Sequence, residues 1–478
     1  MLEERKNKHM KQTHKSRRLL FSCLLISLWI TSWGLTQTTQ TLTLEQCVSM
    51  ALEQNPEVKI ARKQLAKSNA DIWTAYGTLL PSIEASASLQ HAWNIQENTI
   101  PNFLKPMLAP LAPMIPELAL MPDFVTMSFG MENTLTYGAR LTQPLFLGGA
   151  GIAGVQIAYA ARNATQQQLD ATEQSILYKT ANAFYQTLLA RELVQVQEDA
   201  LKQAETNLDI VNKKYDVGSA SGLDKMRAEV DVANLKPAVF AAKSNYQAAL
   251  TGLRTIVGLP PNTEIGVEGD LAFVPDEFAK LTLEELQQQA ASQRPELSAV
   301  MEQKKLASKS LTVARSQFLP KVLFMTDYSY LGMRNKNLNF KQDEMSKGFT
   351  SSISVQLPLF SGFKNTKGYQ KAELDLHIAK DTQKQVQDGI AAEVEIVYNK
   401  FQEARQKYLA AQETIAMAQE AMRLANLMYE EGASTQLEVL SAQLALTQAR
   451  MNHISALYEY QMARYGLRKA AGILIQTL

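Results

Sequence analysis

Two short glycine-containing turns carry the polar and charged residues that could do chemistry in this sequence. They read "YDVGSAS" at 215–221 and "YEEGAST" at 429–435, and they lie 214 residues apart (429 − 215). Asp224 follows the first turn, and Tyr429 and Glu438 frame the second. A phenol and two carboxylates can exchange hydrogen bonds, and carboxylates attract cations. The chemistry that these turns offer is therefore hydrogen bonding and charge.

Helix capping explains most of the residue choices at both turns. A glycine that adopts a positive φ ends a helix, and Ser or Thr followed three residues later by an acid begins one with a capping box. Gly218 and Gly432 are the predicted helix ends, and Ser221 and Thr435 are the predicted N-caps. Asp224 and Glu438 are the predicted capping-box acids. One interpretation of the turns is thus purely structural.

No catalytic, cofactor or metal motif is found elsewhere in the chain. The sequence holds five His and two Cys residues, and none of them has metal-ligand spacing. A P-loop and a nucleophile elbow are both lacking. Charged residues make up 20% of the chain and the net charge is +1, so a nucleic-acid partner is not indicated. We predict that the protein is not an enzyme and uses no cofactor or metal.

The first 36 residues are typical of a secretory signal peptide. Basic residues precede the apolar run "LLFSCLLISLWI" at 19–30, which is shorter than a membrane span of about 20 residues. Later apolar runs do not reach 18 residues, so no transmembrane helix is predicted after the leader. A mature chain that spans a membrane must then do so with strands.

The remainder of the chain is an internal duplication. "LTLEQCVSMALEQNPEV" at 42–58 matches "LTLEELQQQAASQRPEL" at 281–297 with an offset of 239, and "QPLFLGG" at 143–149 matches "LPLFSGF" at 357–363 with an offset of 214. The difference (239 − 214 = 25) is an insertion in the first half. We predict repeats at 37–259 and 282–478, joined by a linker at 260–281.

Each repeat is predicted to form helix, strand, strand, helix, helix. Thr43 and Thr282 are expected to cap a first helix of roughly 35 residues that ends near Pro81 or Pro320. Alternation of period two then predicts strands at about 82–95 and 131–143, and at about 321–331 and 349–357. In the first strand the polar face carries Glu84, Ser86 and Gln90, opposite Ile83 and Leu89. The proline-rich insertion at 101–122 is predicted to be a long loop at the strand tips.

Long helical hairpins follow the strands in both repeats. Residues 149–216 and 363–430 are nearly free of Gly and Pro, and such runs would extend for ~100 Å as helices. Small and apolar residues recur three and four positions apart, which suits antiparallel coiled coils. Pro237 is expected to kink or break the second helix of the first hairpin. The two glycine turns are the bends of these hairpins.

Four strands are too few for a transmembrane barrel, which needs at least about eight. Three copies of the chain would supply twelve (3 × 4) and leave no exposed edge in lipid. The chain resembles the TolC-like outer-membrane efflux protein family. The resemblance spans 42–473 and rests on the paired "NPEV"/"RPEL", "PLF" and Tyr-x-x-Gly motifs in the same order in both halves.

The resemblance implies a mainly α fold with a β-barrel portion, in which a homotrimer forms a twelve-stranded outer-membrane barrel and an α-helical periplasmic barrel. It implies export of small molecules or proteins from an inner-membrane transporter through a periplasmic adaptor. Asp224, Tyr429 and Glu438 would line the periplasmic aperture. The turns would dock the adaptor, and these positions are Gly218, Ser219, Ser221, Gly432, Ala433 and Thr435.

Several alternatives stay open at this point. Ser434 and Ser441 stand where the family pattern leads one to expect a basic and an acidic residue, so a latch ion pair at the turns is not supported. A non-channel periplasmic coiled-coil scaffold is the contrasting hypothesis, although it would not need four alternating strands. Cargo, whether drug, metal or protein, and the partner pump are not specified by the sequence.

Overall fold

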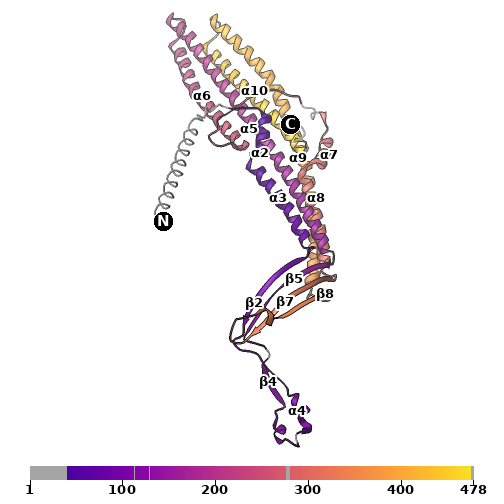
Figure 1. Ribbon diagram of the computed structural model, residues 1–478. Helices are drawn as coiled ribbons and strands as arrows, with labels where there is room; N and C mark the ends of the chain where they lie inside the picture. The colour runs from indigo at the N-terminus through magenta and orange to yellow at the C-terminus, as the bar shows by residue number, and fades with distance from the viewer. Residues whose placement is uncertain (1–39, 112, 129, 276–279, 475–478) are drawn as a thin grey trace, which may run out of the picture.

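The computed structural model describes residues 40–474 apart from 112, 129 and 276–279. The predicted signal peptide at 1–36 lies outside the described residues. The chain is elongated: long helices form one end, a four-stranded sheet follows, and a small extension lies beyond the far tip of the sheet (Figure 1). None of the described helices is both long enough and apolar enough to cross a membrane.

Two long helical hairpins form the largest part of the structure, and both were predicted. In the first, α5 (Ala150–Asp216) packs against α6 (Gly222–Val257), and in the second, α9 (Lys364–Glu430) packs against α10 (Gln436–Ala470). Helices α5 and α9 each have 67 residues, which corresponds to ~100 Å. The two hairpins contact each other mainly through α5 and α10.

Of the kink or break predicted at Pro237, the break does not occur, because α6 continues through it to Val257. A proline removes one backbone hydrogen bond from a helix. The packing of α6 along α5 offsets that loss.

Each repeat opens with two short helices where we predicted a single long one. These are α2 (Leu44–Gln54) and α3 (Pro56–Gly77) in the first repeat, and α7 (Leu283–Gln293) and α8 (Pro295–Ser316) in the second. The residues between them are extended, because a residue that precedes proline avoids the helical region. The capping boxes at Thr43 and Thr282 are confirmed.

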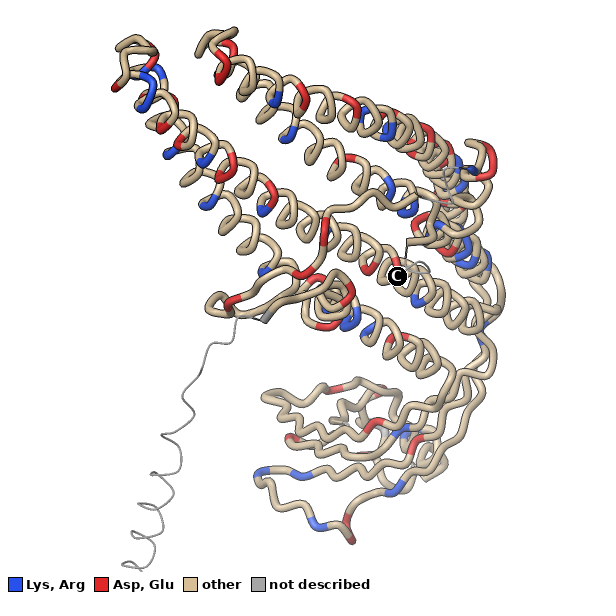
Figure 2. Tube along the Cα trace, turned by 90° about the horizontal axis from the view of Figure 1, so that it is seen from above, with Lys and Arg blue, Asp and Glu red and all other residues tan. Residues whose placement is uncertain are grey.

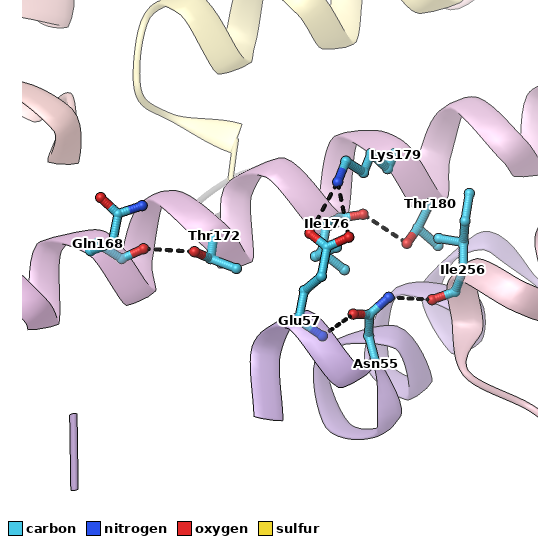
Figure 3. A network of polar contacts seen from close by, with 8 residues as sticks. All are labelled: Asn55, Glu57, Gln168, Thr172, Ile176, Lys179, Thr180 and Ile256. Atoms are coloured by element: carbon cyan, nitrogen blue, oxygen red, sulfur yellow. Dashed lines mark hydrogen bonds and ion pairs between the residues drawn. The ribbon is translucent and has the colours of Figure 1, made fainter. Parts of the chain in front are cut away.

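Asn55, which lies between α2 and α3 of the first repeat, also ties these helices to the hairpin (Figure 3). Asn55 Oδ1 accepts from the Glu57 backbone N–H at 2.8 Å, and Asn55 Nδ2 donates to the carbonyl of Ile256 at 2.8 Å. The Glu57 carboxylate in turn receives Lys179 Nζ of α5 at 3.0 Å. Asn55 and Glu57 together therefore cap α3 and fix it against both α5 and α6.

Arg294 holds the equivalent position in the second repeat and is only 5% exposed. Its guanidinium donates to the carbonyl of Ala470 at 3.2 Å and pairs with Glu296 at 2.9 Å and Glu393 at 3.0 Å. A buried arginine thus replaces the asparagine cap as the link between short helices and hairpin.

Four strands form one antiparallel sheet in the order β2-β5-β7-β8. They are β2 (Ser82–His91), β5 (Asn133–Leu147), β7 (Lys321–Arg334) and β8 (Ser346–Gln356), close to the predicted ranges. Each repeat supplies one pair, and the pairing of β5 with β7 joins the two repeats. Strands β2 and β8 lie at the edges of this sheet, each with one strand neighbour.

The register gives the sheet two unlike faces, because opposed residues point to the same side. One face is apolar and aromatic and includes Leu89, Leu135, Tyr137, Tyr330 and Phe349. The other is mainly polar, with Ser86 beside Gly138 and Ser88 beside Thr136, although β7 adds Met325, Leu331 and Met333 to it. On the apolar face, Ile83, Phe349, Ile353 and Val355 are each more than 60% exposed in the single chain.

The proline-rich insertion has regular structure, which corrects the prediction of a plain loop. Strands β3 (Glu97–Pro101) and β4 (Phe124–Ser128) pair with each other and carry α4 (Leu104–Leu108) and the 3-10 turns η1 (Ala109–Leu111) and η2 (Pro116–Leu120). The prolines prevent one long element but permit short ones. The extension projects past the tip of the sheet (Figure 1).

The predicted linker at 260–281 contains β6 (Ile265–Val267), which pairs in parallel with β1 (Gln40–Leu42). This pair packs over Phe184 and Leu253 of the first hairpin, and Cys47 lies in the same core. Sequence reasoning missed both strands because each has only three residues.

Candidate functional site

The two hairpin turns have the same backbone conformation. Gly218 has φ of 75° and Gly432 has φ of 76°, which places both in the left-handed region that favours glycine. After Gly218, the Ser219 N–H donates back to the carbonyl of Lys214 at 2.7 Å. The equivalent bond runs from the Ala433 N–H to the carbonyl of Met428 at 2.8 Å. The glycines thus end α5 and α9 in the predicted way.

A complete capping box begins α6 after the first turn, as predicted. The Asp224 N–H donates to Ser221 Oγ at 3.1 Å, and the Ser221 N–H donates to Asp224 Oδ2 at 3.2 Å. Ser221 Oγ also donates to Asp224 Oδ2 at 2.7 Å. The carboxylate of Asp224 is therefore already engaged in its own helix start.

The second turn lacks the predicted capping box. Thr435 occupies the N-cap position of α10 in an extended conformation, but its side chain makes no capping hydrogen bond. The carboxylate of Glu438 instead accepts a hydrogen bond from the hydroxyl of Ser434. Thr435 is thus the N-cap residue as predicted, but the predicted capping box with Glu438 was wrong, because Ser434, one residue before the N-cap, binds the acid instead.

Tyr429 is buried where the two hairpins meet, with 9% of its surface exposed. It belongs to a cluster with Val211 of α5, Ala228 of α6 and Val439 of α10. Lys214 Nζ of α5 donates to the Tyr429 carbonyl at 2.5 Å and lies 4.1 Å from the centroid of its ring. One lysine therefore binds both the backbone and the aromatic face of the opposite hairpin.

Burial raises the pKa of the Tyr429 phenol, and the negative charge of Asp224 raises this pKa further. Asp224 is thus close enough to act on Tyr429 through its charge. Within the part of the chain that the structure describes, no hydrogen bond joins the two side chains. The structure brings Asp224 and Tyr429 into one neighbourhood, whereas Glu438 interacts within its own turn.

An apolar groove of about 630 Å³ lies beside the turns, between α6 and α10. Its apolar lining residues are Leu223, Met226, Val230, Leu437, Leu440 and Leu444. Five of them are more than half exposed in the single chain, the exception being Leu440. Arg227 and Asp231 supply charge at the same groove. The groove is a surface that a helix of another chain could cover.

Two contacts between the hairpins were missed by sequence reasoning. Lys214 is one, and Gln443 of α10 is the other; its Nε2 donates to Asp231 Oδ2 of α6 at 3.3 Å. Burial raises the pKa of the Asp231 carboxyl, which the hydrogen bond partly offsets. A lysine inside an otherwise apolar seam was the only available signal for Lys214. Groups of three or more His, Cys, Asp or Glu side chains able to hold a metal are not found among the described residues.

A family comparison decides the identity of the chain. The family described as "Outer membrane efflux protein" matches residues 47–259 and 286–473, which are most of the two repeats. The chain belongs to the outer membrane efflux protein family. It is accordingly an outer-membrane protein that reaches into the periplasm, as predicted from the resemblance. Homologues in this family are channels rather than enzymes.

Individual members of the outer membrane efflux protein family are distant in sequence. The outer membrane protein TolC of Vibrio cholerae serotype O1 is 21% identical over 72% of this chain and 78% of its own length. Protein CyaE of Bordetella pertussis is 25% identical over 72% of this chain and 71% of its own length. The CmeC outer membrane channel of Campylobacter jejuni shares the fold, with a TM-score of 0.73 at 18% identity over 90% of this chain and 86% of its own.

Proposed function

We propose that three copies of this chain form a continuous duct, with a twelve-stranded barrel in the outer membrane and an α-helical barrel in the periplasm. The observation that carries this proposal is the two-faced sheet with β2 and β8 at its edges. An unpaired strand edge cannot lie in lipid, because its backbone groups would lack partners. Pairing β2 of one copy with β8 of the next would satisfy both edges.

The faces of the sheet support an inside and an outside for this barrel. The apolar face, with exposed Ile83, Phe349 and Ile353, suits contact with outer-membrane lipid. The serine- and threonine-rich face, which includes Glu84, Ser86 and Gln90 of the predicted polar face, suits a water-filled interior. The duct would therefore conduct polar cargo past the membrane.

The hairpin turns are proposed as the periplasmic aperture. Asp224, Tyr429 and Glu438 lie at or next to the two turns, and three copies would repeat each carboxylate around the axis. Like charges that face one another favour cations. The contact of Lys214 with Tyr429 would hold the hairpins of one chain together while the aperture is narrow. Opening would separate them.

A periplasmic adaptor is the proposed partner at the turns, and an inner-membrane transporter would supply cargo and energy. The turn residues Gly218, Ser219, Ser221, Gly432, Ala433 and Thr435 would be the docking positions. The exposed leucines and methionine of the neighbouring groove support docking, because an apolar surface of this kind is normally covered by a partner helix. Small molecules or proteins are the proposed cargo.

Planar-bilayer conductance of the purified trimer tests this function. Wild type is compared with the double variant Asp224→Ala/Glu438→Ala, and we expect discrete steps that become larger or less cation-preferring in the variant. Conductance steps that are the same in the variant as in wild type would support a channel but would show that Asp224 and Glu438 do not line its aperture. No steps from a folded trimer, in either form, would favour the alternative function, a periplasmic coiled-coil scaffold.

A further inference from the structure

Charged residues are sparse in the four-stranded sheet (Figure 2). Away from the strand ends, only three lie in β2, β5, β7 and β8: Glu84, Arg140 and Asp327. The strand register places them side by side, with Glu84 opposite Arg140 and Arg140 opposite Asp327. We call these three residues the charged row. It crosses three neighbouring strands at one level of the sheet.

The charged row lies on the polar face. Directly opposed residues of an antiparallel pair share a face and have Cβ atoms about 4.5–5.5 Å apart. Most neighbours of the row on that face are small and uncharged, among them Ser82, Gly138, Thr142 and Ser329, and Met325 of β7 is a long uncharged one. Small neighbours leave the charged side chains as the longest groups on this face at that level. Whatever passes along the polar face therefore meets the row.

The charges within the row do not cancel. Arg140 Nε donates to Asp327 Oδ1 at 2.5 Å, which neutralises one carboxylate. Glu84 faces the same guanidinium from the other side, so each chain keeps one surplus negative charge at this level. Lys321 shares the face but lies six residues from Asp327 along β7, which is about 20 Å. That separation exceeds the Debye length of ~8 Å at physiological salt.

We infer that the charged row is a second ion-selecting site, separate from the hairpin turns, which sets a cation preference inside the sheet portion of the duct. The inference rests on the proposed function, since it requires the polar face to line the lumen. Three copies would place three surplus carboxylates around the axis at one height. Glu84 supplies the selecting charge, and Arg140 limits it by pairing with Asp327. The selected species are small monovalent cations.

Two substitutions in the row should shift ion preference in opposite directions. Glu84→Gln removes the surplus charge, and we expect the K⁺ over Cl⁻ permeability ratio to fall about twofold or more. Arg140→Gln frees the Asp327 carboxylate, and the same ratio should rise by a similar factor. A merely structural role would not produce opposite signs.

Lys347→Gln is the matched control for Arg140→Gln. It also removes one positive charge from the sheet, but Lys347 lies on the apolar face opposite Tyr330. The permeability ratio of this control should equal that of its parent. A ratio that rises as much as in Arg140→Gln would show that net charge rather than position is responsible, and would overturn the inference.

The measurement is the reversal potential in a KCl gradient, for single trimers of the full chain in planar bilayers. Each variant is made in wild type and in an Asp224→Asn/Glu438→Gln background, so that acids at the turns do not mask the row. Unchanged ratios for Glu84→Gln and Arg140→Gln in that background would overturn the inference while conductance steps persist. Loss of all steps in every form, including wild type, would instead contradict the proposed duct.

Discussion

Lys214 and Tyr429 join the two hairpins of one chain close to their turns. The lysine ammonium donates to the tyrosine carbonyl at 2.5 Å and lies 4.1 Å from the ring centroid. The neighbouring residue Lys213 pairs instead with Asp209 one turn earlier in its own helix. Two adjacent lysines therefore have different roles, one between hairpins and one within a single helix.

Substituting Lys214→Met should loosen the contact between the hairpins. The substitution removes a charge-assisted hydrogen bond and a cation–π contact, together worth about 1–2 kcal/mol. We expect longer or more frequent open events in single-channel recordings, by about thirtyfold at most, because 1.4 kcal/mol corresponds to a factor of about ten. Lys213→Met is the matched control and should leave gating unchanged, because its exposed ion pair contributes little. Equal gating in the two variants would remove Lys214 from the proposed closure.

The acids that follow the two turns should differ in their effect on local stability. Asp224→Ala breaks a complete capping box and should destabilise the start of α6 by about 1 kcal/mol. Glu438→Ala removes only a contact with Ser434 and should change the start of α10 less. Amide hydrogen exchange at residues 222–226 and 436–440 measures both. If Glu438→Ala accelerates exchange at 436–440 more than Asp224→Ala accelerates it at 222–226, the result would contradict the observed caps.

Arg294→Asn should lower the stability of the protein less than Arg294→Ala does. Arg294→Ala deletes the bonds to Ala470, Glu296 and Glu393 and should destabilise the junction by roughly 2–3 kcal/mol. Arg294→Asn can cap α8 as Asn55 caps α3, which should recover about 1 kcal/mol. Denaturant unfolding followed by hydrogen exchange in α8 compares them. Equal losses would show that no cap forms at this position.

His453 should make the helical portion slightly less stable in acid. Burial lowers its pKa, and its ring packs 5.7 Å from that of Tyr408. Folding favours the neutral imidazole, so its contribution is complete above the unfolded pKa near 6.5 and is lost as pH falls below it. The effect is small because the residue is only partly buried. The thermal midpoint should fall from pH 7.5 to pH 5 by less in His453→Gln than in wild type.

Local patterns in the sequence determined the repeats, the hairpins, the four main strands and the two faces of each strand. These features depend on periodicity, on proline stops and on glycine turns, which act within a few residues. Gly218, Gly432 and the Ser221–Asp224 box lie as predicted for that reason. Where two nearby groups competed, as Ser434 and Thr435 do for Glu438, the local pattern was not sufficient.

Tertiary structure alone decided which distant residues meet. Strand β5 pairs with β7 of the other repeat, and only that order places Arg140 beside Asp327. Lys214 reaches Tyr429 because α5 and α9 end side by side, 215 positions apart in the chain. Tertiary packing also carries α6 through Pro237, against its local preference. Such contacts depend on how whole elements pack, because the residues that form them carry no sequence signal of their partners.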